Sequence, residues 1–532
     1  MAQPTDRRIG PTPGLTSWAM LSLAGWLLGS PCAVAQGPRP FRVPAGKFRF
    51  EVRLAPGMET AAARGRLFVI VGRSRIPEPR RTVGTTGFDT APFFAADVDL
   101  SSRQPGVIDQ RAAAFPLPSL AQLPSGHYFV QAALRVNPDL RGLYAPANLY
   151  SDIVELQLDP GRGGAVKLTL NQADPPEELP APTPYLRWIR IRSELLSKFR
   201  GRPVYLRAGV LLPRNYDPEG SKRYPLRIDI GDYGTRYTYL RLKFEKNPDF
   251  HSAWLADGAP RMILLYLDGD GPFGDPYQVN SANNGPYGDA ITRELIPYVE
   301  RTYRAVGQPW ARVLTGGSTG GWVSLALQVF YPDYFNGAWA GYPDGVDFRA
   351  VQLLNIYQDS NAYVNAHGFE RPAARDLDGD VTWTMRHELQ MENAMGSGDS
   401  YTTSGGQWGA WNAVYSPRGE AGRPMPLWDP KTGSLDRSVA EQWKRYDLRL
   451  LLQQNWATLG PKLRGKLHIH VGEADQYFLN NGIHLLDDFL SKAQPPYGGS
   501  IVYGVGKGHG WSPLTARQRM EEMQVAMDRA RP

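Results

Sequence analysis

The chain has 532 residues, which is too long for one ordinary hydrophobic core and predicts two or three domains. Hydrophobic residues make up 42% and charged residues 21%, so a globular protein is expected and a disordered one is excluded. The formal net charge is +7, but Lys and Arg are scattered without a basic run, and we predict no binding to nucleic acid.

The first 35 residues have the three parts of an export signal. Arg7 and Arg8 give a positive start, residues 18–28 form an apolar run, and residues 33–35 (AVA) offer a small-residue cleavage site. The apolar run is shorter than the roughly 20 residues that span a bilayer. We therefore predict a signal peptide over 1–35, no stable membrane anchor, and a mature protein that is exported to the periplasm or the extracellular space.

The single cysteine, Cys32, lies before the expected cut. Pro31 precedes it where a lipoprotein signal needs a small residue, so lipid attachment is not expected. Residues 9–11 after the arginine pair also match a twin-arginine signal poorly. The mature chain then has no cysteine, which excludes disulfides and thiol catalysis despite export.

Residues 36–170 are predicted to form an all-β, sandwich-like accessory domain. Short alternating or β-branched runs, separated by Gly and Pro, occur at 47–54, 66–71, 93–100, 127–136, 153–158 and 165–170. In KFRFEVRL, residues 47–54, apolar side chains alternate with charged ones, as expected for a strand with one solvated face. His127 stands alone at a strand start and is interpreted as a surface or structural residue. We expect no catalytic group in this region.

A proline-rich, acidic stretch at 171–185 is predicted to be a semi-rigid linker. From 186 to 532 strand and helix patterns alternate, which indicates an α/β domain with a mainly parallel, doubly wound sheet. The predicted strands are 204–212, 226–230, 262–267, 313–315, 338–341, 467–471 and 501–505. An amphipathic helix is expected over 289–304, where Pro297 predicts a kink.

The sequence RVLTGGSTGGWVSLALQVF, residues 312–330, runs from a short apolar strand through a serine between glycines into a helix. Gly316, Ser318 and Gly320 fit the G-x-S-x-G pattern of a nucleophile elbow. Glycine is expected at both flanks because side chains there would collide with the strand and the helix. No G-K-[ST] follows, which excludes a P-loop. We predict that Ser318 is a nucleophile.

A serine nucleophile needs a base and an orienting acid, which follow it in the order serine, acid, histidine in this fold. His509 lies in a glycine-rich loop just beyond the last predicted strand and is the predicted base. Asp475 lies in the loop after strand 467–471 and is the predicted acid, with Glu473 as the competitor. The other five histidines after Ser318 are interpreted as packing or surface residues.

The oxyanion of such a reaction is held by backbone N–H groups. We predict one from Thr319, at the start of the helix, and a second near Tyr233, in the loop after strand 226–230. The alternatives are a plain turn at Tyr233 and a side-chain role for Tyr233 or Asp232.

A long insertion is expected over about 348–463. Its aromatic segment at 408–415 forms either the wall of a substrate pocket or, as the favoured interpretation, a small core of its own. Asp376, Asp378 and Asp380 resemble the start of a calcium loop, but Val381 replaces its glycine and His387 its final acid. We interpret them as a solvated acidic turn and predict no metal site.

From about 195 to 511 the chain resembles the Putative esterase family of α/β-hydrolases, which includes esterase D-like, feruloyl, acetyl xylan and enterochelin esterases. The matching segments are 294–304, 316–321, 331–344, 471–479 and 508–511. The resemblance implies that Ser318, Asp475 and His509 take the nucleophile, acid and base positions. A β-sandwich before the hydrolase domain is similar to the enterochelin esterase arrangement. The chain departs from its relatives at GDYG, 231–234, where many have a histidine-glycine pair, and in its long insertion.

These residues predict a secreted serine carboxylic-ester hydrolase that works through an acyl-enzyme, without cofactor or metal. The substrate is expected to be a small-molecule or carbohydrate-linked ester. The alternatives are an acyltransferase with the same triad and a non-catalytic binding protein on a hydrolase scaffold. A peptidase is disfavoured because the region before the linker is too short for a propeller. The sequence assigns neither the natural ester nor the oligomeric state.

Overall fold

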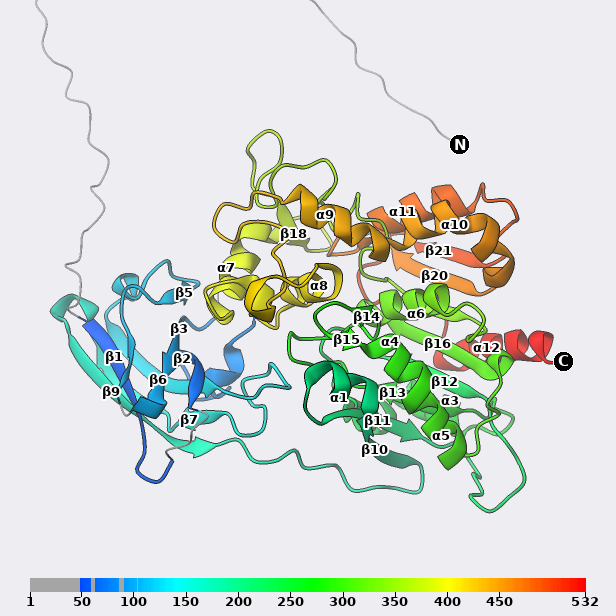
Figure 1. Ribbon diagram of the computed structural model, residues 1–532, viewed down its shortest axis with the longest axis horizontal. Helices are drawn as coiled ribbons and strands as arrows, with labels where there is room; N and C mark the ends of the chain where they lie inside the picture. Colours follow the sequence, from blue (N-terminus) through cyan, green and yellow to red (C-terminus); the bar gives the residue numbers. More distant parts are fainter. Residues whose placement is uncertain (1–47, 59–62, 86–89, 103) are drawn as a thin grey trace, which may run out of the picture. The chain divides into compact units, whose positions relative to one another are not determined.

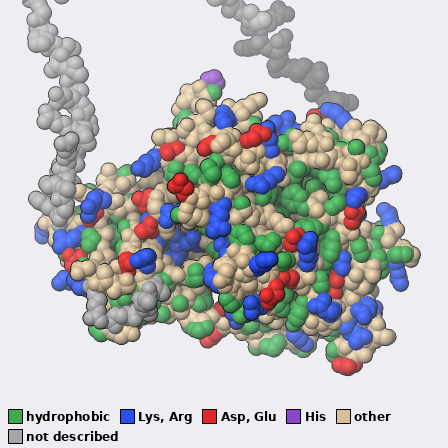
Figure 2. Space-filling model, viewed as in Figure 1, with side chains coloured by type: hydrophobic (Ala, Val, Ile, Leu, Met, Phe, Trp, Pro, Cys, Tyr) green, Lys and Arg blue, Asp and Glu red, His purple; other side chains and the backbone are tan. Residues whose placement is uncertain are grey.

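The computed structural model describes residues 48–532, apart from 59–62, 86–89 and 103. The predicted signal peptide lies outside the described residues. Within the described ranges, no helix is both long and apolar enough to cross a membrane. On the face shown in Figure 2, basic and acidic side chains are interspersed, in keeping with their scatter along the sequence.

The region before the linker is built from strands of one sheet. They are β1 (Phe48–Leu54), β2 (Arg64–Gly72), β3 (Phe93–Asp99), β4 (Gly106–Ile108), β5 (Ala113–Phe115), β6 (Gly126–Arg135), β7 (Leu149–Ser151), β8 (Val154–Leu158) and β9 (Gly164–Ala173). The sheet has the order β4-β1-β9-β7-β6-β2-β3-β5, with β8 also paired to β6. Only β1 and β9 pair in parallel among these strands. Short 3-10 turns connect them: η1 (Pro79–Thr82), η2 (Leu100–Ser102), η3 (Leu120–Gln122) and η4 (Pro160–Arg162).

This sheet curls around one core. Phe50 of β1 and Leu67 of β2 belong to the same buried cluster although three strands separate β1 from β2 in the sheet. All six strands predicted from the sequence are present. The sandwich-like packing therefore arises within one continuous hydrogen-bonded sheet. The sequence did not predict β4, β5 and β7, because each has only three residues, too few to show a periodicity.

Strand β2 is buried on both faces. Leu67 and Val69 point into the core of the curled sheet, while Phe68 and Ile70 belong to a second cluster on its outer face. That second cluster includes residues of α7 (Met385–Met395), a helix of the insertion. The linker is also anchored: Asp174 pairs with Arg80, with Nη1 and Oδ2 2.7 Å apart.

The second sheet matches the predicted α/β arrangement. Its strands are β10 (Leu186–Ser193), β11 (Val204–Leu211), β12 (Leu226–Ile230), β13 (Ile263–Leu267), β16 (Arg312–Gly317), β17 (Ala338–Gly341), β20 (Leu467–Gly472) and β21 (Ser500–Gly504). Their order is β10-β11-β13-β12-β16-β17-β20-β21. The pairs β10/β11 and β11/β13 are antiparallel and the remaining pairs are parallel. The predicted fold class is confirmed; β10 alone among these strands was not predicted.

Helices cover both faces of this sheet (Figure 1). They are α1 (Glu194–Arg200), α2 (Tyr239–Lys246), α3 (Pro248–Leu255), α4 (Tyr287–Ala290), α5 (Ile296–Thr302), α6 (Thr319–Phe330), α10 (Leu448–Leu463), α11 (Leu479–Leu490) and α12 (Ala516–Ala530). Side chains of β13 divide by alternation: Leu264 packs with α2, α3 and α12, and Leu265 with the cluster that contains α5, α6, α10 and α11. The sheet is therefore the middle of three layers.

The helix predicted over 289–304 is present but irregular. It begins as α4, widens into a π-helical turn, η5 (Ile291–Leu295), and continues as α5. Pro297 is the second residue after the wide turn, and a proline has no N–H to donate to the preceding turn. The irregularity therefore falls where Pro297 predicts a kink.

The remaining elements are short. They are β14 (Asn280–Ser281), β15 (Gly285–Pro286), η6 (Pro309–Ala311), β18 (Pro372–Arg375), β19 (Val381–Thr384), η7 (Tyr401–Thr403), α8 (Gln407–Tyr415), η8 (Glu420–Gly422), α9 (Arg437–Trp443) and η9 (Lys444–Tyr446).

The aromatic side chains of the insertion do not form a separate core, and that expectation is wrong. Tyr415 of α8 packs on Trp322 of α6, with ring centroids 5.3 Å apart. Both residues belong to the same buried cluster as the central strands. Helix α8 is buried along most of its length, so its aromatic rings extend the core of the α/β domain over α6.

Candidate active site

The residues predicted to carry out catalysis lie after neighbouring strands at one edge of the parallel sheet. Ser318 follows β16, Asp475 follows β20 and His509 follows β21. Tyr233 lies in the loop after β12. Because parallel strands end at the same edge, the topology brings these loops together.

Ser318 has the geometry of a nucleophile elbow. Its φ is 52° and its ψ is −122°, a strained conformation for a residue with a side chain, and α6 begins at the next residue. A Cβ at Gly316 would lie 2.5 Å from backbone atoms of Gly320, and one at Gly320 would lie 2.7 Å from the carbonyl oxygen of Gly231. Both approaches are closer than a real Cβ allows. The glycines are therefore required by the close passage of strand, helix and neighbouring loop.

Asp475 and His509 form a hydrogen-bonded pair. The distance between His509 Nδ1 and Asp475 Oδ2 is 2.9 Å, and Asp475 is 0% exposed. The other oxygen, Oδ1, accepts the backbone N–H of Tyr477 at 2.9 Å. The His509 ring lies against Tyr342 and Tyr477, with centroid distances of 4.6 and 4.9 Å. These contacts fix the imidazole and leave its Nε2 as the atom available to a reacting group.

The competing acid is used elsewhere. Glu473 Oε2 lies 2.9 Å from Nε2 of His484, on helix α11. His468 stacks on Trp339 in the sheet, and burial lowers the pKa of His470 to about 3. Of these residues, the structure brings only Asp475 to His509, in the arrangement that the chain order predicts.

The two predicted oxyanion donors lie beside the elbow. Thr319 is the first residue of α6, where backbone N–H groups have no partner within the helix. The loop that contains Tyr233 begins at Gly231, whose carbonyl oxygen passes close to Gly320. The phenol of Tyr233 donates to the Gly405 carbonyl oxygen at 2.8 Å, so its side chain is tied to the insertion. The backbone roles of Thr319 and Tyr233 stay predictions.

Sequence reasoning missed one acidic residue at this edge, Asp344. It follows β17, the strand next to the elbow strand, and Ser318 Oγ donates to its Oδ1 at 3.3 Å. It is 2% exposed. A carboxylate just after a strand adjacent to the nucleophile strand was the available signal, because such a position belongs to the same edge of the sheet.

A cavity of about 370 Å³ adjoins the site. Tyr233, Gln407 and Tyr477 line it close to the candidate catalytic residues. Phe68 and Arg141, from the N-terminal region, line it as well. Residues of the N-terminal region and of the hydrolase domain thus surround this space.

Two carboxyl groups of this cavity are unusual acids. Burial raises the pKa of Asp275 to about 8, and burial together with the charge of Glu392 raises the pKa of Glu388 to about 8. Both groups are therefore harder to ionise than ordinary carboxyl groups.

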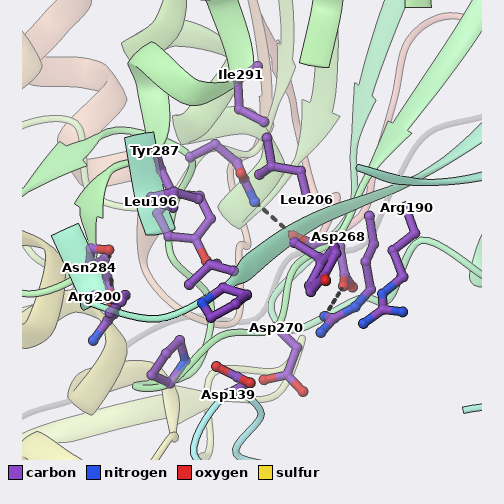
Figure 3. Close-up of a pocket in the computed structure, with 16 residues that line it drawn as sticks. Asp139, Arg190, Leu196, Arg200, Leu206, Asp268, Asp270, Asn284, Tyr287 and Ile291 are labelled. Atoms are coloured by element: carbon purple, nitrogen blue, oxygen red, sulfur yellow. Dashed lines mark hydrogen bonds and ion pairs between the residues drawn. The ribbon is translucent and has the colours of Figure 1, made fainter. Parts of the chain in front are cut away.

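A second cavity, of about 130 Å³, is lined by residues of the hydrolase domain and by Asp139 of the N-terminal region (Figure 3). Arginine and aspartate side chains are mixed around it, among them Arg190, Arg200, Asp268 and Asp270. Asp268 is already paired, since its Oδ2 lies 3.2 Å from Nη1 of Arg207. Tyr233, Gln407 and Tyr477, through which the first cavity adjoins the site, do not line this second cavity, so it is not part of the candidate active site.

The acidic turn at 376–380 is stabilised by hydrogen bonds from its backbone N–H groups to the side chain of Asp376. Asp376 Oδ1 accepts the N–H groups of Asp378 and Asp380 at 3.0 and 2.9 Å. In the part of the chain that the structure describes, no three His, Cys, Asp or Glu side chains are grouped so as to hold a metal ion.

Residues 273–485 match the model of a protein family described as Putative esterase. The matched stretch contains the elbow, Asp344 and Asp475, and it confirms the family resemblance. This part of the chain is similar to that family, and the protein is an esterase with an α/β-hydrolase fold. No curated protein matches the sequence.

Several solved structures are similar to the chain. A ferulic acid esterase is 13% identical over 64% of this chain and 95% of its own, with a TM-score of 0.37. An S-formylglutathione hydrolase from Agrobacterium tumefaciens is 12% identical over 65% of this chain and 92% of its own, with a TM-score of 0.33. MPT51 (FbpC1) of Mycobacterium tuberculosis is 10% identical over 65% of this chain and 98% of its own, with a TM-score of 0.36.

Proposed function

We propose that the protein is an exported serine carboxylic-ester hydrolase in which Ser318, His509 and Asp475 form the catalytic triad. The observation that carries the proposal is the 2.9 Å pair between Asp475 and His509 at the sheet edge that also presents Ser318 in a strained elbow. That edge is where α/β-hydrolases carry their nucleophile.

The reaction proceeds in two halves. His509 Nε2 takes the proton of the Ser318 hydroxyl as Oγ attacks the ester carbonyl, and the oxyanion is held by the backbone N–H groups of Thr319 and the Tyr233 loop. The carbon–oxygen bond to the alcohol breaks, and the alcohol leaves with the proton from His509. Water, deprotonated by His509, then attacks the acyl-enzyme and releases the acid. Asp475 stabilises the imidazolium in both halves.

The Ser318 hydroxyl donates to Asp344 in this structure. For the first step it must exchange that acceptor for Nε2 of His509. Such rearrangement is common, because catalytic hydrogen bonds often form fully only when substrate is bound.

Labelling with a fluorophosphonate probe tests the nucleophile. We expect the purified protein to be labelled once and Ser318→Ala to be unlabelled and inactive on a p-nitrophenyl ester. Ser324→Ala is the matched control, since Ser324 lies on the same helix and donates only to the Gly320 carbonyl oxygen, at 2.6 Å. Hydrolysis retained by Ser318→Ala would exclude the mechanism.

Export is the second part of the proposal. It rests on the sequence of residues 1–35. Expression of the full chain in a bacterial host and mass spectrometry of the product should give a mature N-terminus near Gln36 in the periplasm or medium. An uncut chain confined to the cytoplasm would contradict export without bearing on the chemistry.

A further inference from the structure

Asp344 is a buried carboxylate in contact with the candidate nucleophile, and the triad does not use it. The acid position of the triad is occupied, because Asp475 holds Nδ1 of His509. Asp344 nevertheless reaches the reacting atom, since its Oδ1 lies 3.3 Å from Ser318 Oγ. A charged group in such a place needs a reason, because burying a carboxylate is costly unless it is paired.

The two oxygens of Asp344 have different surroundings. Oδ2 is saturated with donors: Tyr277 Oη at 2.7 Å, Thr319 Oγ1 at 2.9 Å, Gln407 Nε2 at 3.2 Å and Trp411 Nε1 at 3.3 Å. Oδ1 has the Ser318 hydroxyl. The four donors fix the plane of the carboxylate and direct Oδ1 at the place where the acyl group attaches.

Burial raises the pKa of Asp344 and outweighs the hydrogen bonds from Tyr277 and Thr319 and the nearby imidazole of His509, which act in the opposite direction. The donors around Oδ2 therefore offset only part of the effect of burial on this carboxyl group.

Acylation of Ser318 removes the hydrogen-bond donor that faces Oδ1 of Asp344. The hydroxyl proton leaves, and Oγ becomes an ester oxygen, which accepts hydrogen bonds but cannot donate one. Oδ1 of Asp344 then faces an acceptor at about the former distance and has lost its donor. Leaving a buried oxygen unsatisfied is costly, and more so when the oxygen is charged. The acyl-enzyme is disfavoured unless the acyl group itself brings a donor.

The position of such a donor follows from the bonding. The acyl carbon is bonded to Oγ, and the next carbon along the chain is two bonds from Oγ. A hydroxyl or ammonium group on that next carbon lies within hydrogen-bond reach of an oxygen that is 3.3 Å from Oγ. A donor farther along a flexible chain would lose rotational freedom to reach the same oxygen.

We propose that Asp344 is the specificity-determining residue on the acyl side, and that the preferred substrates are esters of acids with a hydroxyl or ammonium group on the carbon next to the carbonyl. The inference rests on the serine hydrolase mechanism proposed above. Sites built to bond a substrate donor reject analogues that lack it by up to about 10⁴–10⁵-fold. We expect discrimination of at least about 100-fold.

Three methyl esters of equal size test the proposal: methyl propionate without a donor, methyl lactate with a hydroxyl and methyl alaninate with an amine. Methanol release gives kcat/KM for each, at a pH where the amine is protonated. The wild-type enzyme should prefer lactate or alaninate to propionate, and the better of the two identifies the donor as hydroxyl or ammonium. Equal values for all three esters would overturn the inference.

The substitution Asp344→Asn separates a role in specificity from a merely structural role, because only a role in specificity predicts a changed order of preference among the esters. The four donors at Oδ2 should hold the amide oxygen there, which turns the amide NH2 toward Ser318. The variant should then lose the preference for lactate and alaninate, and its activity relative to wild type should be highest for methyl pyruvate, whose keto oxygen accepts. A uniform fall across all four esters would mark Asp344 as structural and overturn the inference.

Two further results keep the proposals separate. If the wild-type enzyme reacts with the fluorophosphonate probe and hydrolyses propionate as well as lactate and alaninate, the specificity inference fails and the mechanism stands. If the probe labels nothing and no ester is hydrolysed, the proposed function fails and the inference with it. Should Asp344→Asn not fold, the three wild-type values decide the question alone.

Discussion

The partner of His509 is the sharpest point at which the proposed mechanism can be tested, because the chain offers two acids in one loop. Asp475 is fully buried and accepts from His509 Nδ1 at 2.9 Å. Glu473, two residues earlier, lies on the surface side and pairs with His484 at 2.9 Å. The substitutions Asp475→Asn and Glu473→Gln make the same chemical change at each position, from carboxylate to amide.

The expected magnitudes differ widely. An amide in place of Asp475 can point its NH2 group at Nδ1 of His509, which forces the imidazole into the wrong tautomer. It can instead point its oxygen at Nδ1, but that oxygen carries no charge and does not stabilise the imidazolium. The corresponding change in a serine protease triad lowers kcat by about 10⁴. At 1.36 kcal/mol for each factor of ten, this is about 5 kcal/mol of transition-state stabilisation. The Glu473 pair is partly exposed and should contribute at most about 1 kcal/mol.

The assay is kcat for a p-nitrophenyl ester across neutral pH, with thermal unfolding of each variant as the check on folding. We expect Asp475→Asn to lose several orders of magnitude in kcat and Glu473→Gln to change it less than threefold. A folded Asp475→Asn that keeps more than a tenth of wild-type kcat would refute the assignment of the acid. A large loss in Glu473→Gln alone would move the acid to that residue.

Three further predictions concern stability. Gly316→Ala should reduce folded yield and activity sharply, because its Cβ would lie 2.5 Å from backbone, whereas Gly345→Ala, with nearest contact at 3.5 Å, should behave like wild type; circular dichroism and esterase assays compare them. Arg66 is 2% exposed and donates to the Ala394 carbonyl oxygen at 2.8 Å, so Arg66→Met should lower the free energy of unfolding by about 1–3 kcal/mol in urea titrations; an unchanged midpoint would contradict this contact. His470 is 5% exposed with a folded pKa of about 3 against 6.5 unfolded, so the unfolded state binds more protons between these values and stability falls as pH falls from about 6.5 to 3. His470→Gln should remove about 1.4 kcal/mol per pH unit of that dependence, and parallel curves for variant and wild type would disprove it.

The sequence alone predicted the sheet edge well because its signals are local. A strand pattern, a serine between glycines and an acid or histidine just beyond a later strand can each be recognised within a dozen residues. Parallel pairing then fixes where they meet, so the order of these signals suffices to predict that Ser318, Asp475 and His509 lie at one edge of the sheet, as the structure has them. The sequence favoured Asp475 over Glu473 as the acid but did not decide between them. Which of two carboxylates in one loop reaches a histidine depends on the path of the loop.

Asp344 and its donors were beyond sequence reasoning for a different reason. Gln407 and Trp411 approach Asp344 across 63 and 67 positions of the chain, from a helix whose place over the sheet has no local signature. Aromatic residues in α8 predict burial but not the surface that they cover. The same limit explains the wrong expectation of a separate core in the insertion.

The contacts of the insertion show how the N-terminal sheet bears on the active site. Phe68 of β2 packs in one cluster with Met391 of α7. On the same helix, Glu392 accepts the N–H groups of Trp408 and Gly409 at 2.9 and 2.8 Å, which satisfies the first turn of α8. The N-terminal sheet thus supports α7, and α7 fixes the start of α8.

Helix α8 in turn completes the surroundings of Asp344. Its first residue, Gln407, and Trp411 one turn later both donate to Asp344 Oδ2, and Oδ1 of the same carboxylate contacts Ser318. A shift of α8 by even about 1 Å would break hydrogen bonds of 3.2 and 3.3 Å and free the carboxylate to rotate. Contacts therefore run from β2 through α7 and α8 to Asp344 and Ser318, so the N-terminal sheet supports the helix whose side chains orient this carboxylate.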